Sequence, residues 1–238
     1  MVAQTLPLPN IKKFFIPDEG YVIADVDLDR ADAQVVAWEA DDDILKDAFR
    51  QGADVHQVNA DDIGCTRKQA KAGVHATNYY VKAATLADTL GVSVADAQDF
   101  ITKWFELHPG IKDWHHRIEA RLKHTHTISN AFGYQRRFFD RYSEQLLREA
   151  LAWIPQSTVA IIINQGMANI DEYLPWVDIL LQVHDSLVIQ FPKDKMDLRW
   201  RLKQEMLIEV PYDDPLVIPV SMQVSETSWG DCEDIAWS

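Results

Sequence analysis

The sequence predicts an α+β protein with many helices. Several segments show the helical period of about 3.6 residues, and others show the alternation or the short apolar run of β-strands. The strands do not alternate with helices as in βαβ units, so a mixed fold is favoured over a parallel α/β sheet. Of the 238 residues, 47% are apolar and 25% are charged, which suits one or two globular domains with a core.

The N-terminal part predicts one strand followed by two helices. Residues 21–28 alternate apolar and acidic side chains, so that Asp25 and Asp27 share one face of the expected strand. Helices are expected at residues 31–39 and 43–51, the second of which is followed by a glycine that stops it.

The central part is predicted to be helical. Thr66 is a suitable N-cap for a helix over residues 67–80. Ser93 and Asp96 have the spacing of a shortened capping box at the start of a helix that reaches Phe105. A further helix is expected at residues 111–122, after a His-Pro-Gly segment that separates it from the preceding one.

The C-terminal half predicts two hairpins and one long helix. Residues 127–139 form a hairpin around Phe132-Gly133, and residues 144–167 form a long, mostly buried helix. Two apolar strands, 179–183 and 186–191, flank His184-Asp185, which places a carboxylate at the tip of an antiparallel hairpin.

The net charge of −14 excludes a module that binds nucleic acid through a uniformly basic surface. Residues 18–62 hold fourteen acidic against three basic side chains, and most of the net charge therefore lies there. Residues 67–82 and 103–148 are rich in basic side chains. Any contact with DNA is expected to be local or shared with another protein.

Two cysteines, Cys65 and Cys232, cannot form a disulfide framework. The sequence shows no charged-then-apolar leader and no run of eighteen apolar residues. We therefore expect a cytoplasmic protein with no membrane partner.

Asp27 and Asp185 are the first candidate site residues. Asp27 lies near the end of one expected strand and Asp185 at the tip of a hairpin, each among apolar neighbours. Carboxylates on adjacent sheet elements can bind hard divalent cations, which prefer oxygen ligands. Ordinary strand-end and turn aspartates are the commoner interpretation on spacing alone, because Asp is frequent in turns.

A second candidate group lies on the helix expected at 67–80. Arg67, Lys71, His75 and Tyr79 follow one another at intervals of four, so they form one stripe on the helix. Such a stripe can bind a triphosphate with its cations and stack a base on its aromatic ring. A solvated basic face is the alternative.

Three segments resemble motifs A, B and C of the family A DNA polymerases, the class of bacterial polymerase I and T-odd phage enzymes. They are DVDLDRADAQVVAW (25–38), RKQAKAGVHATNYY (67–80) and LLQVHDSLVI (180–189), in the family's order. Weaker matches are DVHQVNA (54–60), AFGYQRRFFD (131–140) and IPQS (154–157). The resemblance extends from Phe14 to the C-terminus.

The resemblance implies a right-hand polymerase fold without its thumb. An antiparallel-sheet palm would carry an inserted helical fingers subdomain. The implied ranges are 1–62 for the first part of the palm with motif A, 63–125 for the fingers with motif B, and 126–238 for the second part of the palm with motif C.

The resemblance also implies the roles of individual residues. Asp27, Asp185 and the carbonyl of Leu28 would bind two Mg²⁺ ions, and Lys71 would protonate the leaving group as a catalytic residue. The expected dNTP-binding residues are His56, Arg67, Lys71, His75, Tyr79 and Asp32. The expected DNA-binding residues are Gln156, His184, Arg136 and Arg137. For Asp25 and Asp29, which flank Asp27, solvation is the simplest interpretation.

The chain departs from the family pattern at several positions that bear on sugar selectivity and turnover rate. His75 replaces the usual Phe or Tyr, Tyr80 replaces a Gly, and Ser186 replaces a Glu. Ala76 also replaces a Gly, and Asp32 is one methylene shorter than the usual Glu. None of the implied metal ligands is changed.

The implied function is DNA-directed DNA synthesis, with dNMP transferred to a primer 3′-hydroxyl on a template. Because motif A begins so close to the start of the sequence, we expect a fragment or a split, phage-type enzyme. A second protein chain would then supply the thumb. Whether that chain also carries an exonuclease domain stays open.

Two other functions stay open. The first is a fragment of a single-subunit RNA polymerase, a class whose motif C also tends to read His-Asp-Ser; Asp32 and the 54–60 segment argue against it. The second is a non-catalytic assembly subunit with a polymerase fold; the retained Asp27, Asp185 and Lys71 argue against it.

Overall fold

The computed structural model describes residues 11–237, which form two compact units. One unit contains the described residues up to Ala31 together with those from Thr158 onward, and the other contains Asp32–Ser157. These units follow from packing, whereas the ranges 1–62, 63–125 and 126–238 follow motifs and stay a prediction. Helices and an antiparallel sheet occur together, so the α+β class is confirmed.

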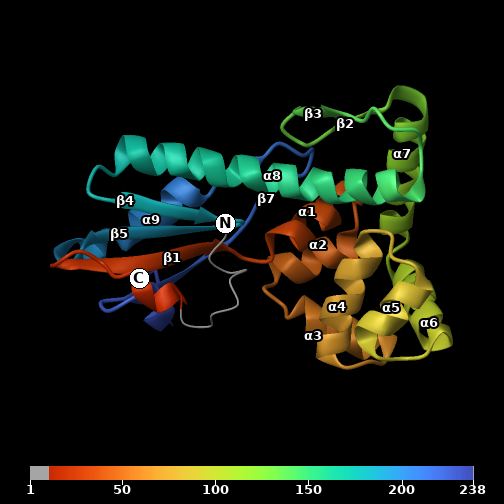
Figure 1. The fold of residues 1–238 in the computed structure, drawn as a ribbon, viewed down its shortest axis with the longest axis horizontal. Coiled ribbons are helices and arrows are strands. Elements are labelled where there is room, and N and C mark those ends of the chain that lie inside the picture. The colour runs from red at the N-terminus through yellow and green to blue at the C-terminus, as the bar shows by residue number, and fades with distance from the viewer. Residues whose placement is uncertain (1–10, 238) are drawn as a thin grey trace. The chain divides into compact units, whose positions relative to one another are not determined.

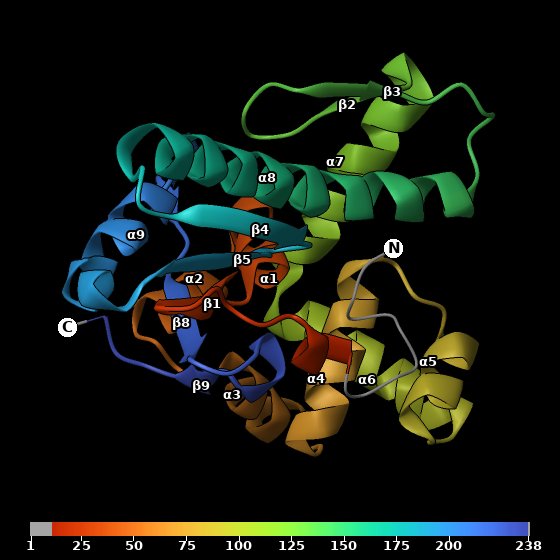
Figure 2. The same ribbon diagram turned by 60° about the vertical axis from the view of Figure 1, so that its left-hand side comes forward.

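The first unit is built on a five-stranded sheet, which Figures 1 and 2 show in red, teal and blue. Its strands are β1 (Tyr21–Leu28), β4 (Asp178–Val183), β5 (Ser186–Pro192), β8 (Val220–Ser225) and β9 (Glu233–Asp234). Their order is β4-β5-β1-β8-β9, and every neighbouring pair is antiparallel. The three strands predicted at 21–28, 179–183 and 186–191 are confirmed.

Strand β1 occupies the middle of this sheet because most of its residues are apolar and buried. Successive side chains of a strand point to opposite faces, so Ile23, Asp25 and Asp27 share one face. On that face Ile23 packs in a core cluster with Val188 and Trp229. Asp27 therefore projects from the same face of the sheet. Trp229 covers that face nearer the start of β1, at Ile23 and Asp25.

The rest of the first unit surrounds the sheet with short elements. These are η2 (Ile11–Phe14), η3 (Lys193–Leu198), α9 (Arg199–Met206), β6 (Glu209–Val210), β7 (Leu216–Val217) and η4 (Trp229–Asp231). The C-terminal half of helix α8 (Glu144–Tyr173) packs closely on α9, because a Cβ added at Gly166 would lie 2.5 Å from the Met206 sulfur.

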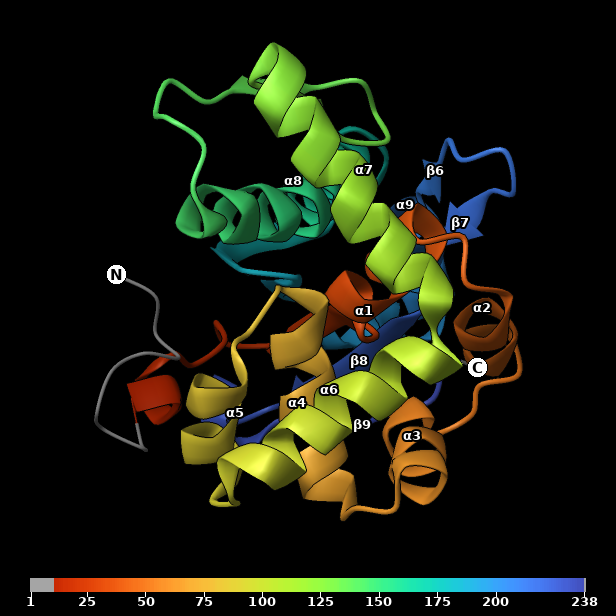
Figure 3. The same cartoon turned by 90° about the vertical axis from the view of Figure 1, so that its right-hand side faces the viewer.

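The second unit is mainly helical (Figure 3). Its helices are α1 (Ala31–Glu39), α2 (Asp43–Arg50), α3 (Val55–Ile63), α4 (Arg67–Asn78), α5 (Ala83–Leu90), α6 (Val94–Leu107), α7 (Pro109–Thr125) and the first half of α8. A hairpin of β2 (Thr127–Ser129) and β3 (Gln135–Arg137) follows α7, as predicted. The capping boxes at Thr66 and Ser93 are both present.

Two buried polar residues connect the ends of three helices in this unit. Asp42 is the N-cap of α2 and accepts a hydrogen bond from the Leu45 amide at 2.9 Å. The same carboxylate lies 3.0 Å from Nδ1 of His108, the residue between α6 and α7. Both side chains are almost inaccessible to solvent. This pair fixes the start of α2 against the α6–α7 junction.

Several elements differ from the prediction. Helix α4 ends at Asn78 rather than Tyr80, because Tyr80 has a left-handed backbone with φ of 61° that cannot continue a helix. Helix α8 continues to Tyr173 rather than residue 167. Helices α3 and α5 were not expected.

Helix α8 is long and apolar enough to cross a membrane by length and composition alone. More than half of its most apolar window is buried inside the protein. A core helix meets the same criteria, so this property is weak support for a membrane span.

Candidate active site

Asp27 and Asp185 meet at one end of the sheet. Asp27 pairs with Ser186 of β5 on one side and with Ser221 of β8 on the other. The Leu28 amide donates a hydrogen bond to the Asp185 carbonyl oxygen at 3.1 Å, which fixes the β4–β5 turn beside the end of β1. The neighbouring His184 has φ of 55°, as expected in a tight two-residue hairpin turn.

The two carboxylates form an electrostatically unfavourable group in the absence of a cation. Burial, followed by the negative charges of Asp185, Asp25 and Asp29, raises the pKa of Asp27 to about 7, against a smaller lowering effect of Lys12. A divalent cation would relieve this repulsion, since an opposite charge favours the ionised carboxylate. The donor set of two carboxylates and a backbone carbonyl at Leu28 is also the oxygen-rich set that Mg²⁺ prefers.

Among residues 11–237 there is no group of three or more His, Cys, Asp or Glu side chains placed to hold a metal ion. Sites for Mg²⁺ often contain one or two protein carboxylates, with water and substrate phosphates completing the coordination. The pair formed by Asp27 and Asp185 therefore fits a metal that is bound together with its substrate.

Asp25 is not solvated, which corrects the expectation from the sequence. Its side chain is buried, and one carboxylate oxygen accepts a 2.7 Å hydrogen bond from the Trp229 indole. The Lys12 ammonium lies 3.7 Å from the same oxygen and 4.1 Å from the centre of the Trp229 ring. Asp29, in contrast, is half-exposed and accepts hydrogen bonds from Arg30. Asp25 thus has a structural partner, and Asp27 is the carboxylate left at the sheet end.

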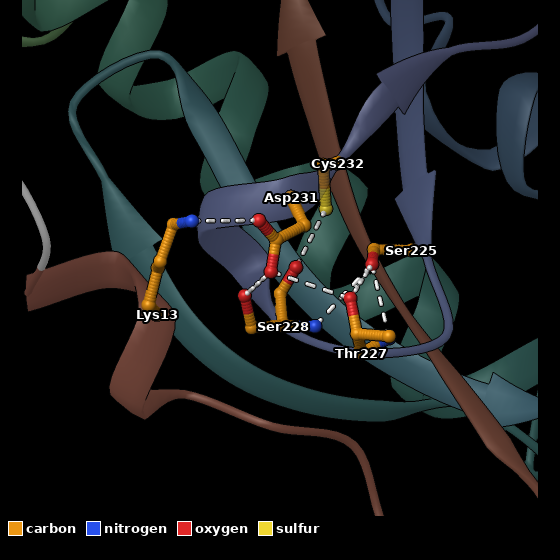
Figure 4. Close-up of polar contacts among 6 residues, drawn as sticks. All are labelled: Lys13, Ser225, Thr227, Ser228, Asp231 and Cys232. Carbon is orange, nitrogen blue, oxygen red and sulfur yellow. Dashed lines mark hydrogen bonds and ion pairs between the residues drawn. The ribbon is translucent and has the colours of Figure 1, made fainter.

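The turn that carries Trp229 is fixed by a polar network (Figure 4). Asp231 accepts hydrogen bonds from the Ser228 hydroxyl at 2.5 Å and the Thr227 hydroxyl at 3.3 Å, and it pairs with Lys13 at 3.1 Å. The Ser225 hydroxyl accepts from the Thr227 amide at 3.0 Å. These bonds are local turn contacts that place the indole over Asp25.

The predicted stripe on α4 is present in the second unit. Arg67, Lys71 and His75 are exposed on the same face, and Tyr79, directly after the helix, is half-buried. The His75 and Tyr79 rings meet edge to face with centroids 4.9 Å apart. The stripe therefore presents two cations and two rings in the predicted order.

The two ends of this stripe have polar partners. The Arg67 Nε donates to Asp54 at 2.7 Å, a contact that lowers the pKa of the Asp54 carboxyl. The Tyr79 hydroxyl lies 3.4 Å from the Asp32 carboxylate. Burial, followed by the charge of Asp32, raises the pKa of Tyr79 far above its ordinary value, so the phenol stays neutral. Among the described residues, Lys71 has no such partner, and its ammonium is available to a ligand.

The other predicted residues lie at several places. His56 is half-buried on α3 and Gln156 is exposed on α8, both in the second unit. Arg136 and Arg137 are exposed on β3, each above a phenylalanine ring at 4.7 and 5.8 Å. His184 is exposed beside Asp185 in the first unit.

Replacement of Asp27 by Asn is expected to stabilise the metal-free protein, and more so at higher pH. The folded protein retains the Asp27 proton up to a pH of about 7, whereas the unfolded chain releases it near 3.8. The folded state therefore binds more protons between these values, and its stability falls as the pH rises through them. Since the side chain is partly exposed, we expect a gain of roughly 1–2 kcal/mol at about pH 8.

Urea unfolding with EDTA at about pH 5 and about pH 8 measures this difference. Asp194→Asn, on an exposed carboxylate of the same unit, is the control and is expected to change neither midpoint. An equal or larger gain for Asp27→Asn at the lower pH would contradict the raised pKa.

Comparisons with known proteins show the family to which this chain belongs. The family model described as DNA polymerase family A matches residues 4–231. DNA polymerase I of Bacillus caldotenax is 30% identical over 218 residues, which cover 83% of this chain and 25% of the relative. DNA polymerase I of Deinococcus radiodurans is 29% identical over 234 residues, covering 90% of this chain and 24% of the relative. The chain thus spans about a quarter of the length of the curated relatives it matches.

One solved structure resembles the fold over nearly the whole chain. It is the POL domain of Pol1 from M. smegmatis, in complex with DNA primer-template and dNTP. The TM-score is 0.86 with 24% identity, and the match covers 96% of this chain and 44% of the other. With the match of the family model to most of its length, this chain belongs to DNA polymerase family A.

Proposed function

We propose that this chain is the catalytic palm-and-fingers portion of a DNA-directed DNA polymerase. The observation that carries the proposal is the meeting of Asp27 and Asp185 at the sheet end, where burial and mutual repulsion raise the Asp27 pKa to about 7. The two carboxylates repel each other unless cations bind between them. They belong to a chain whose family is described as DNA polymerase family A. Family A DNA polymerases generally use divalent metal ions.

In this proposal Asp27, Asp185 and the Leu28 carbonyl bind two Mg²⁺ ions. When bound, these ions lower the pKa of a primer 3′-hydroxyl and neutralise the charge of departing pyrophosphate. The protein's own contribution is to hold the carboxylates on paired strands, so little reorganisation is needed at the moment of reaction.

The stripe on α4 then binds the incoming dNTP. Arg67 offers its terminal N–H groups to phosphate while its Nε is held by Asp54, because a guanidinium has five donors. Lys71 binds phosphate and gives a proton to the leaving pyrophosphate oxygen. His56, His75, Tyr79 and Asp32 complete the expected dNTP-binding set. Since Tyr79 and Asp32 contact each other, a change in either side chain would affect the other.

The proposed DNA contacts involve Gln156, His184, Arg136 and Arg137. All four side chains are exposed, which contact with a primer-template requires. Because its substrates are DNA and dNTPs, we infer a cytoplasmic site of action in a bacterial or phage-infected cell.

Primer extension with Mg²⁺ is the test of this function. A labelled primer-template is incubated with the chain and either dNTPs or rNTPs. Extension with dNTPs alone supports a DNA polymerase. Equal extension with rNTPs would favour the RNA polymerase alternative. No extension by the chain, even with added thumb-bearing protein, would favour the non-catalytic assembly subunit.

We further propose a split, phage-type enzyme in which a second chain supplies a basic thumb. Whether that chain also carries an exonuclease domain stays open. The support is electrostatic: the chain carries a net charge of −14, whereas phosphate contacts dominate affinity for DNA. Local basic side chains such as Arg136 and Arg137 can position DNA but leave most of the surface repulsive.

The chain alone is therefore expected to bind primer-template weakly. Fluorescence anisotropy at about 0.15 M salt should give a dissociation constant well above about 1 μM, and a protein encoded beside this chain should tighten it about tenfold or more. Sub-micromolar binding by the isolated chain would remove the need for a partner.

A further inference from the structure

The C-terminal end of α4 contains a carbonyl that the helix itself does not satisfy. The last carbonyls of a helix lack intrahelical donors. Here the amides of Tyr79 and Tyr80 turn back to the carbonyls of Ala76 and Thr77 at 3.2 and 3.1 Å. The carbonyl of Asn78, the last helical residue, instead lies 2.8 Å from Nε2 of His115 on α7.

The chemistry of this contact defines the state of the histidine. A carbonyl oxygen can only accept a hydrogen bond, so His115 Nε2 must carry the proton. Burial lowers the pKa of His115 to about 4, and the imidazole is therefore neutral near pH 7. The contact is a neutral N–H donor bonded to a helix-terminal carbonyl, and His115 itself is only 3% exposed.

Three aromatic rings contact the imidazole. Ring centroids of Tyr80, Phe105 and Trp114 lie 5.8, 5.7 and 5.5 Å from that of His115. Tyr80 has a left-handed backbone, with φ of 61°, which is costly for an aromatic residue and persists only where its surroundings enforce it. His115 contacts both the Tyr80 ring and the carbonyl two residues before it.

Other polar groups at this helix end do not fix it. Among the described residues, the Thr77 hydroxyl and the Asn78 side-chain oxygen are buried without a hydrogen-bond partner. The next residue is Tyr79, whose hydroxyl reaches Asp32 at 3.4 Å. A shift of the Asn78 carbonyl would therefore move Tyr79 relative to both Asp32 and the helix stripe.

We propose that His115 is a positioning residue that fixes the end of α4 and, through it, the ring of Tyr79. Its contacts with this helix end are those with Asn78 and Tyr80, and it acts through these two residues. The kinetic consequence of this role, a lower KM for the incoming dNTP, rests on the proposed function. Its structural consequence, an ordered α4 end, does not.

Hydrogen exchange of the metal-free protein tests the structural consequence. In His115→Leu the donor is lost, and the amides of residues 79–81 are expected to exchange about tenfold faster. His115→Gln can place an N–H donor near the same carbonyl and is expected to restore protection. His124→Leu, the same change at an exposed position of α7, is the matched control and should resemble the parent.

Single-nucleotide extension kinetics test the functional consequence. For His115→Leu we expect the KM for dNTP to rise about tenfold, with kcat within about twofold of the parent. His115→Gln should have a KM for dNTP close to that of the parent. A general loss of folding would instead speed exchange throughout α6 and α7 and lower kcat.

These measurements separate the two proposals. Unchanged exchange at residues 79–81 in His115→Leu, or faster exchange throughout the second unit, would overturn the positioning role. Should His115→Leu fail to fold, His115→Gln still decides, because parent-like exchange supports the donor role and tenfold faster exchange contradicts it. If the parent has no extension activity, the proposed function fails while the exchange result still stands.

Discussion

Primer extension is expected to fall by about a thousandfold or more when Asp185 is replaced by Asn. The amide is nearly the same size as the carboxylate but has no charge to offer a cation. Asp185 lies in the tight turn whose backbone carbonyl accepts from the Leu28 amide, and the substitution leaves that bond intact. The fold should therefore persist while the proposed metal site loses half of its carboxylate charge.

The loss should be specific to this carboxylate. Steady-state extension at saturating dNTP and Mg²⁺ measures it, and far-UV circular dichroism with a thermal melt checks the fold. Asp194→Asn changes an exposed carboxylate of the same unit and is expected to leave the rate unchanged. Extension by Asp185→Asn within tenfold of the parent would refute the assignment of Asp185 as a metal ligand.

Much of the fold could be predicted because its elements carry local patterns. The N-cap at Thr66 and the capping box at Ser93 indicated where α4 and α6 begin. Helix α3 also carries local indications of its ends, since Asp54 is its N-cap and Gly64 ends it with φ of 84°. Helix α5 has no side-chain cap at Lys82, so its start carries no such pattern. Strands of two residues near the C-terminus are too short to show alternation.

The candidate site was only partly predictable, because local patterns do not specify long-range contacts. The hairpin that carries Asp185 is local, but its pairing with β1 joins residues about 160 positions apart and was supplied by the family resemblance. The burial of Asp25 depends on Trp229, which lies 204 residues further along the chain. No periodicity in residues 21–28 indicates that partner. Solvation was therefore the simplest interpretation of Asp25, and it was wrong.

The same limit applies to Tyr80. The sequence placed it inside the helix because its neighbours continue the helical period, yet its backbone is left-handed. The contact with His115 comes from another helix. Tertiary packing here overrides local propensity, and it does so directly beside Tyr79, where the end of α4 has consequences for the proposed site.

Replacement of Lys71 by Ala is expected to raise the KM for dNTP about a hundredfold and to lower kcat, while affinity for primer-template stays within about twofold. Lys71 is exposed in the middle of the stripe, between Arg67 and His75, and has no ion-pair partner among the described residues. Its ammonium is thus available for triphosphate. A solvated basic face, the alternative interpretation, predicts unchanged nucleotide dependence.

Lys71→Arg separates the two proposed roles of this side chain. A guanidinium keeps the positive charge for phosphate but stays protonated at all accessible pH values, so it is a poor proton donor. We expect Lys71→Arg to have a KM for dNTP close to that of the parent, whereas its kcat remains low. Lys112→Ala, at an exposed position of α7, is the matched control. If Lys71→Arg restores kcat as well, Lys71 acts through charge alone, and the proton transferred to the leaving group must come from elsewhere.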